Sequence, residues 1–157
     1  VVGSDFNDSI TGSDAGANYL DGGFGANILT GGTGAAVDTF VLHSSADATA
    51  TQTITDFEVG TDHLALSDRE FDLGSSGTLT TGTTGATYAE GTTTISGAAQ
   101  DFGDANAGIV AIDNGGNVEL WHTTDMSAAD STNSHLVGTL NGVNTSALDN
   151  TSFHLAV

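Results

Sequence analysis

The sequence predicts an all-β fold in which a coil of short strands leads into a β-rich C-terminal cap. Three observations support this prediction: a glycine-rich repeat over residues 3–42, a clear hairpin pattern over residues 108–122, and almost no amphipathic helical periodicity. Only residues 98–107 and 126–131 have the composition of a short helical turn. The 157-residue chain lacks proline and cysteine, so no disulfide can hold it together. Packing or bound ions must therefore stabilise the fold.

The repeat has a period of about nine residues and follows the pattern G-G-x-G-x-D-x-U-x, where U is apolar. Residues 22–30 fit it well, with Asn27 at the acid position. The other units are less regular and two of them contain insertions; their acid positions hold Asp8, Asn18 and Asp38. The pattern predicts a tight glycine turn followed by a very short strand. We expect the apolar residues of the four units to stack into one thin ladder that faces the interior: Ile10, Leu20, Leu29 and Phe40.

Strand patterns continue after the repeat. Ile54 and the pair Leu64 and Leu66 alternate with polar residues on either side of turn residues 60–62. Residues 74–100 are rich in Gly, Thr and Ser and predict weak strands.

In the last third of the chain, apolar segments 108–112 and 118–122 flank a Gly/Asn turn, which is typical of a β-hairpin. Two more strands are expected at residues 135–140 and 152–157. We therefore divide the chain into residues 1–73, the coil with its closing strands, and residues 74–157, a β-sandwich-like C-terminal cap.

The charge of the chain is extreme, with 20 acidic residues against one basic residue and a net charge of −19. Such a chain repels nucleic acid and anionic membranes, and no segment has the roughly 18 apolar residues of a membrane span. We expect neither nucleic-acid binding nor membrane insertion. Surface acidity of the halophilic kind would account for the charge alone. The Asp residues, however, fall at fixed positions in glycine-rich turns, which indicates a cation between them.

These nonapeptides, the segment from Asp38 to Val41 and the segment from Asp56 to Asp62 resemble the repeats-in-toxin (RTX) family. The rest of the chain is similar to the serralysin-like C-terminal regions that follow such repeats in bacterial proteins exported by type I secretion. The resemblance implies a parallel β-roll with Ca²⁺ between successive turns. It also implies transient contact with the type I secretion machinery, and folding outside the cell, either in secreted form or at the bacterial cell surface.

Calcium takes six to eight oxygen ligands from carboxylates, amides and backbone carbonyls. In a roll, units two apart lie on the same side, which pairs Asp8 with Asn27 and Asn18 with Asp38. Asp56 and Asp62 are expected to close the last coil; Asp5, Asp14 and Asp21 are secondary candidates. The alternative is that these side chains only satisfy the backbone of their own turns. The six metal-ligand candidates are Asp8, Asn18, Asn27, Asp38, Asp56 and Asp62.

No catalytic motif is evident. The five histidines are scattered without zinc-ligand spacing, there is no G-x-S-x-G segment, and there is no lysine for a phosphate-binding loop or a Schiff base. Trp121 is expected to anchor the cap, with a sugar-stacking platform as the alternative. We expect that the chain is not an enzyme.

Three functions remain open. The first is a secreted calcium-binding module that folds on binding Ca²⁺, in which residues 152–157 serve as an uncleaved export signal, as the last strand of the cap, or as both. The second is a surface filament, matrix or adhesin protein that self-associates through roll ends or strand edges when calcium is bound. The third is the non-catalytic C-terminal part of a secreted protease or carbohydrate-active enzyme.

Overall fold

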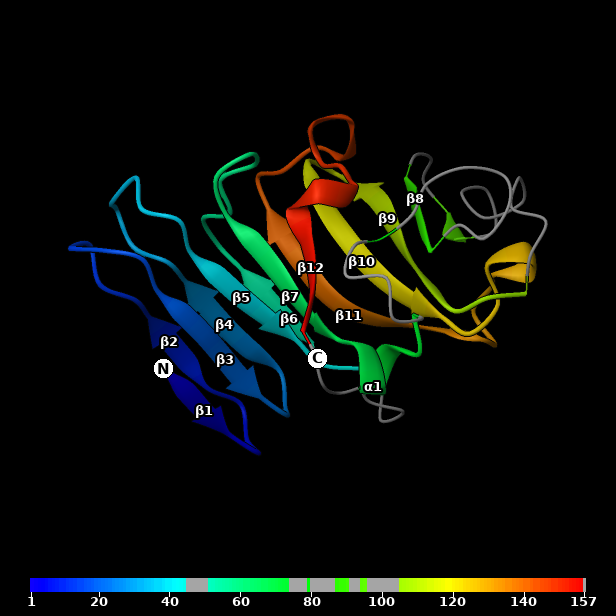
Figure 1. The fold of residues 1–157 in the computed structure, drawn as a ribbon, viewed down its shortest axis with the longest axis horizontal. Helices are drawn as coiled ribbons and strands as arrows, with labels where there is room; N and C mark the ends of the chain where they lie inside the picture. The colour runs from blue at the N-terminus through cyan, green and yellow to red at the C-terminus, as the bar shows by residue number, and fades with distance from the viewer. Residues whose placement is uncertain (45–50, 74–78, 80–86, 91–93, 96–104, 157) are drawn as a thin grey trace.

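The computed structural model describes residues 1–44, 51–73, 79, 87–90, 94–95 and 105–156. Its strands form two sheets (Figure 1), which confirms the all-β prediction. In spatial order, the first sheet contains β1 (Val2–Ser4), β3 (Tyr19–Gly23), β5 (Thr39–Leu42), β7 (His63–Ser67) and β12 (Phe153–Ala156). The second contains β2 (Ser9–Thr11), β4 (Asn27–Thr30), β6 (Gln52–Ile54), β11 (Ser134–Asn141), β10 (Asn117–Thr123), β9 (Gly108–Asn114) and β8 (Tyr88–Glu90).

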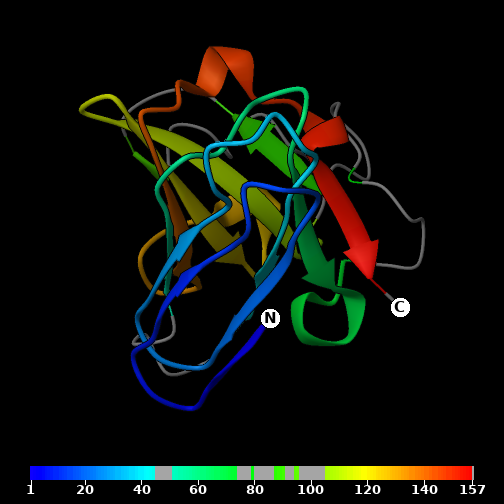
Figure 2. The same cartoon turned by 90° about the vertical axis from the view of Figure 1, so that its left-hand side faces the viewer.

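Successive strands alternate between the two sheets as far as β7, so that each pair of strands completes one coil of the chain. All pairs among β1, β3, β5 and β7 are parallel, as are the pairs among β2, β4 and β6. Figure 2 looks at this coil from the end that carries the N-terminus, where each turn of the chain lies in front of the next. The glycine-rich turns connect the two sheets and therefore stack on one another.

The C-terminal part extends both sheets instead of forming a separate layer. β11 pairs parallel with β6 and antiparallel with β10, while β12 pairs parallel with β7. The two expected segments, 1–73 and 74–157, thus share both sheets. Among the described residues, no helix is long and apolar enough to cross a membrane.

The apolar repeat residues form two columns, so the prediction of one ladder is wrong. Strands that alternate between sheets present their inward residues from opposite sides, and the columns face each other in one core. Each column gains two members that the repeat did not include. One column, on the second sheet, contains Ile10, Leu29, Ile54 and Leu140, and the other contains Leu20, Phe40, Leu64 and Phe153.

The predicted hairpin is confirmed as β9 and β10. Gly115 and Gly116 form its two-residue loop with φ of 63° and 91°, the left-handed region that such loops require. Three short helical turns in the cap begin after Asp125, Asn144 and Asp149, whose side chains accept a backbone N–H: Met126–Ala128, Thr145–Ala147 and Asn150–Ser152.

One further helical turn, α1 (Asp68–Phe71), follows β7. The turn expected over residues 126–131 is present, whereas residues 98–107 lie mostly outside the described residues. Of the weak strands expected in residues 74–100, β8 lies in the described part.

Candidate functional site

Six residues stack in two columns at the starts of the strands, one column per sheet: the four repeat positions, Gln52 and Asp62. Each position lies two residues before an inward-facing apolar residue, so the stacking of the core fixes the stacking of the turns. The structure places the residues of each predicted pair next to each other: Asp8 contacts Asn27 and Asn18 contacts Asp38. The column on the second sheet is Asp8, Asn27 and Gln52, and the column on the first sheet is Asn18, Asp38 and Asp62.

Neighbouring coils are joined at these positions by one recurring hydrogen bond. The backbone N–H of one residue donates to the side-chain Oδ1 of the residue one coil further on. The donor–acceptor distance is 2.8 Å from Asp8 to Asn27, from Asn18 to Asp38, and from Asp38 to Asp62. A short Asp or Asn side chain thus spans the distance between neighbouring coils and bonds to this N–H.

Asp56 and Asp62 both lie at the last coil, as expected. Asp56 accepts the backbone N–H groups of Gly31 and Gly32, at 2.9 and 3.0 Å. Asp62 is buried and accepts N–H groups from Asp38 and Glu58. The carboxylates therefore bond to backbone donors of adjacent turns as well as of their own turn, which goes beyond the alternative interpretation, while their remaining lone pairs stay available.

Negative charge accumulates at this coil. Burial, followed by the charges of Asp38 and Asp56, raises the pKa of the Asp62 carboxyl above its usual value despite two backbone hydrogen bonds that act in the opposite direction. Among the described side chains, no lysine or arginine pairs with Asp38, Asp56 or Asp62. The ion pairs found among these side chains join His43 to Asp21 and to Glu70. A cation would relieve this repulsion.

At the first turn, Asp8 is more exposed and accepts the backbone N–H and the hydroxyl of Ser4, at 2.7 and 2.8 Å. These bonds lower the pKa of Asp8, so its carboxylate stays charged. A Cβ added at Gly3 would collide with both the Gly22 carbonyl oxygen and Asp8 Oδ2. Two oxygens from adjacent coils thus meet beside Gly3.

The donor chemistry at the acidic positions fits a hard divalent cation. Gly31 repeats the arrangement of Gly3, because a Cβ there would collide with Asp38 Oδ2, an oxygen that accepts no hydrogen bond from the described residues. Asp38 is only 5% exposed, so this oxygen has little access to water. In the described part of the chain no three acidic or histidine side chains converge on a single point. Turn carbonyls, which calcium accepts as ligands, would have to supply much of the coordination.

Gln52 is a member of the column that sequence analysis missed. Its side-chain Nε2 donates to the Gly23 carbonyl at 3.1 Å, and its Oε1 is buried without a hydrogen-bond partner. Its position two residues before Ile54 was the available signal. Among the secondary candidates, Asp14 accepts the Thr33 N–H and Asp21 accepts the Gly23 N–H.

The histidines that are scattered in sequence are partly assembled in space. His122 donates from Nε2 to the Phe71 carbonyl at 2.9 Å, so its Nδ1 accepts the Ser44 hydroxyl at 2.9 Å. Ser44 Oγ in turn accepts from His135 Nε2 at 3.1 Å. Burial and then the nearby His135 lower the pKa of His122 to about 4. This chain of hydrogen bonds links the coil to the cap through a neutral imidazole.

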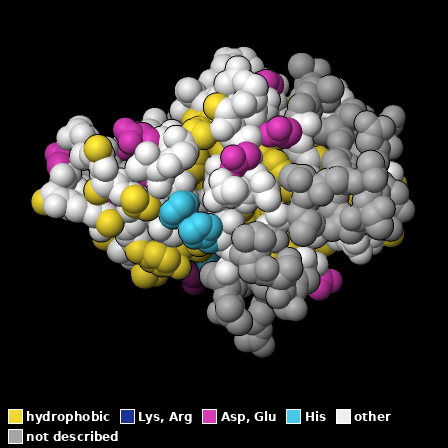
Figure 3. Space-filling view, turned by 45° about the horizontal axis from the view of Figure 1, so that its top comes forward, with side chains coloured by type: hydrophobic (Ala, Val, Ile, Leu, Met, Phe, Trp, Pro, Cys, Tyr) yellow, Lys and Arg dark blue, Asp and Glu magenta, His cyan; other side chains and the backbone are white. Residues whose placement is uncertain are grey.

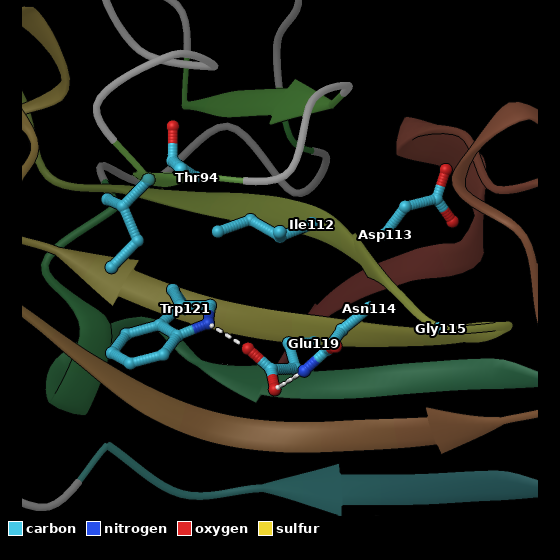
Figure 4. Close-up of a pocket in the computed structure, with 8 residues that line it drawn as sticks. Thr94, Ile112, Asp113, Asn114, Gly115, Glu119 and Trp121 are labelled. Atoms are coloured by element: carbon cyan, nitrogen blue, oxygen red, sulfur yellow. Dashed lines mark hydrogen bonds between the residues drawn. The ribbon is translucent and has the colours of Figure 1, made fainter.

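A pocket of about 390 Å³ lies on the outer face of the β9–β10 hairpin. Figure 4 shows Trp121 and Glu119 side by side on β10, where the indole N–H donates to Glu119 at 3.0 Å and Asn114 donates to the same carboxylate at 2.6 Å. Trp121 is half-buried and packs against the buried cluster of Ala89, Val110, Ile112 and Met126, so it anchors this face as expected. It also lines the pocket.

Exposed apolar side chains gather at the first coils. In Figure 3 they lie at the end of the molecule that carries the N-terminus, with acidic side chains beside them. The large ones are Val1, Val2, Phe6, Tyr19, Phe24, Ile28 and Val37, of which Phe6 is 79% exposed. Scattered single apolar residues are ordinary, but a concentration on one end of a protein is typical of a contact surface.

No family model matches the chain, and no curated protein sequence matches it. Among solved structures, the chain is similar to the solution structure of the AlgE6R3 subunit from the Azotobacter vinelandii mannuronan C5-epimerase. The sequence identity is 23%, the alignment covers 98% of this chain and 80% of that chain, and the TM-score is 0.48.

Proposed function

We propose that this chain is an extracellular calcium-binding module of the RTX type: a short parallel β-roll with a β-sandwich-like cap that folds on Ca²⁺ after type I secretion and has no catalytic role of its own. The observation that carries this proposal is the stacking of the repeat positions, which brings acidic side chains and glycine carbonyls of adjacent coils together. The RTX resemblance of the repeats supports the same assignment.

The calcium ligands would be Asp8, Asp38, Asp56 and Asp62 together with turn carbonyls. These are hard oxygen donors, which calcium prefers and which it accepts in irregular geometry.

Binding and folding are coupled in this proposal. A compact chain with a net charge of −19 repels itself, and each Ca²⁺ cancels two charges while it holds two coils together. Extracellular calcium modules bind with dissociation constants of about 10⁻⁴–10⁻³ M, which leaves them empty in the cytosol and filled outside. The free energy of binding therefore stabilises the fold only after export.

The test is a calcium titration of the full chain, followed by circular dichroism and calorimetry. We expect a coil-like spectrum in chelator and a β spectrum at millimolar Ca²⁺. Sodium chloride of equal ionic strength separates specific binding from screening, and Mg²⁺ separates it from general divalent binding. A β spectrum and an unchanged melting temperature in chelator would overturn the proposal.

Self-association is a second candidate function that the apolar surface of the first coils favours. In a calcium-dependent filament, matrix or adhesin, this surface and the edges of β1 and β2 would contact another copy of the chain. Light scattering after calcium addition tests it. Growth of long assemblies supports it, and a monomer at all calcium concentrations excludes it.

The third candidate is a supporting part of a carbohydrate-active enzyme, which the pocket beside Trp121 favours. An aromatic side chain next to carboxylate and amide groups can bind a neutral sugar through stacking and hydrogen bonds. Trp121 is the only tryptophan of the chain, so its fluorescence reports on this pocket alone. A titration with neutral oligosaccharides that leaves the fluorescence unchanged excludes this candidate.

A further inference from the structure

The side-chain amide of Asn18 lies in a cluster of oxygen atoms. Its nitrogen Nδ2 lies 3.1 Å from the Ser13 carbonyl, 3.0 Å from the Gly16 carbonyl, 3.0 Å from the Gly31 carbonyl and 2.8 Å from Asp38 Oδ1. A primary amide has two N–H groups, so four oxygens exceed what it can satisfy with linear hydrogen bonds. Four oxygens that converge from two coils around one positively polarised atom resemble a cation cage.

Asn27 repeats this arrangement one strand later, in the other column. Its Nδ2 lies 3.2 Å from the Gly23 carbonyl, 3.2 Å from the Phe24 carbonyl and 3.5 Å from the Gly25 carbonyl.

Backbone donors fix the orientation of both amides. Asn18 Oδ1 accepts the Ser13 N–H and Asn27 Oδ1 accepts the Asp8 N–H, each at 2.8 Å. A flipped amide would place N–H against N–H, so the nitrogen must point toward the carbonyl oxygens.

The aspartate turns differ from the asparagine turns in the side-chain atom that lies beside the glycine. A Cβ at Gly12 would collide with the amide nitrogen of Asn18, and a Cβ at Gly22 would collide with both the amide nitrogen of Asn27 and Gln52 Oε1. A Cβ at Gly3 or Gly31 would instead collide with a carboxylate oxygen of Asp8 or Asp38. In the asparagine turns a hydrogen-bond donor therefore lies beside the glycine. In the aspartate turns a carboxylate oxygen lies there instead.

We propose that the side-chain amides of Asn18 and Asn27 take the place of a calcium ion in their own turns, so that these two turns close without metal and only the aspartate turns respond to calcium. This inference rests on the proposed function and deepens it, because it limits the turns that close on calcium binding to the aspartate turns. It predicts that the chain binds fewer ions than it has glycine-rich turns.

The test compares Asn18→Asp and Asn27→Asp with Asn7→Asp in calcium titrations followed by circular dichroism. Asn7 is exposed in the first turn, its Oδ1 accepts the Ala26 N–H, and its amide nitrogen contacts no acceptor among the described residues. All three variants add one negative charge, but only the first two place an oxygen inside a cluster of oxygens. We expect the calcium concentration at the folding midpoint to rise at least threefold for Asn18→Asp and Asn27→Asp relative to Asn7→Asp. Equal midpoints for the three variants would overturn the inference.

A second measurement uses the unmodified chain and does not depend on the folding of a variant. In the folded, calcium-saturated protein, the side-chain NH₂ protons of Asn18 and Asn27 should exchange with deuterium at least tenfold more slowly than those of Asn7. Exchange as fast as that of Asn7 would mean that an ion has displaced the amides, and the inference would be wrong. If the wild-type chain folded equally well with and without calcium, the proposed function would be overturned instead, so the two failures are distinguishable.

Discussion

The backbone N–H of Asp38 donates to a carboxylate oxygen of Asp62 at 2.8 Å, although 24 residues separate them in sequence. Both side chains are buried, at 5% and 4% exposure, and both are acidic. The hydrogen bond fixes their spacing, but it does not remove the repulsion between two carboxylates and the nearby Asp56. A bound cation would offset this repulsion.

Replacing Asp38 by Asn should weaken the response to calcium. The substitution keeps one oxygen for the Asn18 N–H, but removes a buried negative charge and supplies a donor in place of Oδ2. We expect a loss of at least tenfold in calcium affinity by calorimetry and a more stable fold in chelator. Asp72→Asn removes the same charge at an exposed position, where asparagine tolerates the φ of 51°, and should leave both quantities unchanged. Equal effects of the two substitutions would assign the response to net charge alone.

Two glycine substitutions should separate calcium binding from backbone strain. A Cβ at Gly31 would displace the Asp38 carboxylate, so Gly31→Ala should lower calcium affinity. Gly116 has a φ of 91° and nothing within 4 Å of its Cβ position, so Gly116→Ala should cost about 1–2 kcal/mol of stability without changing calcium affinity. Urea unfolding and calorimetry on both variants check this. Unchanged calcium affinity in Gly31→Ala would contradict the proposed position of the ion.

Removal of the Phe40 side chain should show how much the facing columns contribute. Phe40 is fully buried between Leu20 and Leu64, and a Phe→Ala change in such a core costs about 3–5 kcal/mol. The measurement is urea unfolding at saturating calcium. Phe6→Ala removes the same atoms from a side chain that is 79% exposed and should change stability by less than about 0.5 kcal/mol.

Stability should fall in mildly acidic solution because of His122. Its pKa in the folded chain is lowered to about 4, below the ordinary 6.5, since burial disfavours the charged ring. The unfolded chain therefore binds a proton first, and the contribution of His122, present in full above pH 6.5, is lost as the pH falls toward 4. The full loss, reached below pH 4, is about 3 kcal/mol, of which about 2 kcal/mol falls between pH 7.5 and 5. Urea midpoints between pH 7.5 and 5 at saturating calcium measure it.

His122→Gln should remove most of this pH dependence, whereas His154→Gln, at an exposed position, should retain it. A His122→Gln variant with the same slope as the wild type would show that other groups cause the dependence.

Much of the fold could be predicted because the repeat specifies it locally. The spacing from Asn27 to Leu29 is the same in every coil, so one well-fitting unit predicts the turn, the strand and the pairing of Asp8 with Asn27. The hairpin loop at Gly115 and Gly116 was equally predictable, since only glycine and a few polar residues adopt positive φ readily.

Other features depend on contacts between distant segments and could not be predicted. The parallel pairing of β11 with β6 joins the cap to the second sheet, and no local pattern determines it. Gln52 was missed because its turn departs from the glycine pattern, although its spacing to Ile54 is regular. The chain of hydrogen bonds through Ser44 to His122 and His135 joins three segments whose sequences give no sign of proximity.

The position of β12 determines the order in which the molecule can be completed. Phe153 pairs with Leu64 across the edge of the first sheet and ends the column that begins at Leu20. Contacts between segments so far apart in sequence form slowly, because a long loop must lose its entropy before they stabilise anything. A chain that emerges gradually from its N-terminal end would therefore keep β7 as an open edge until residues 153–156 arrive.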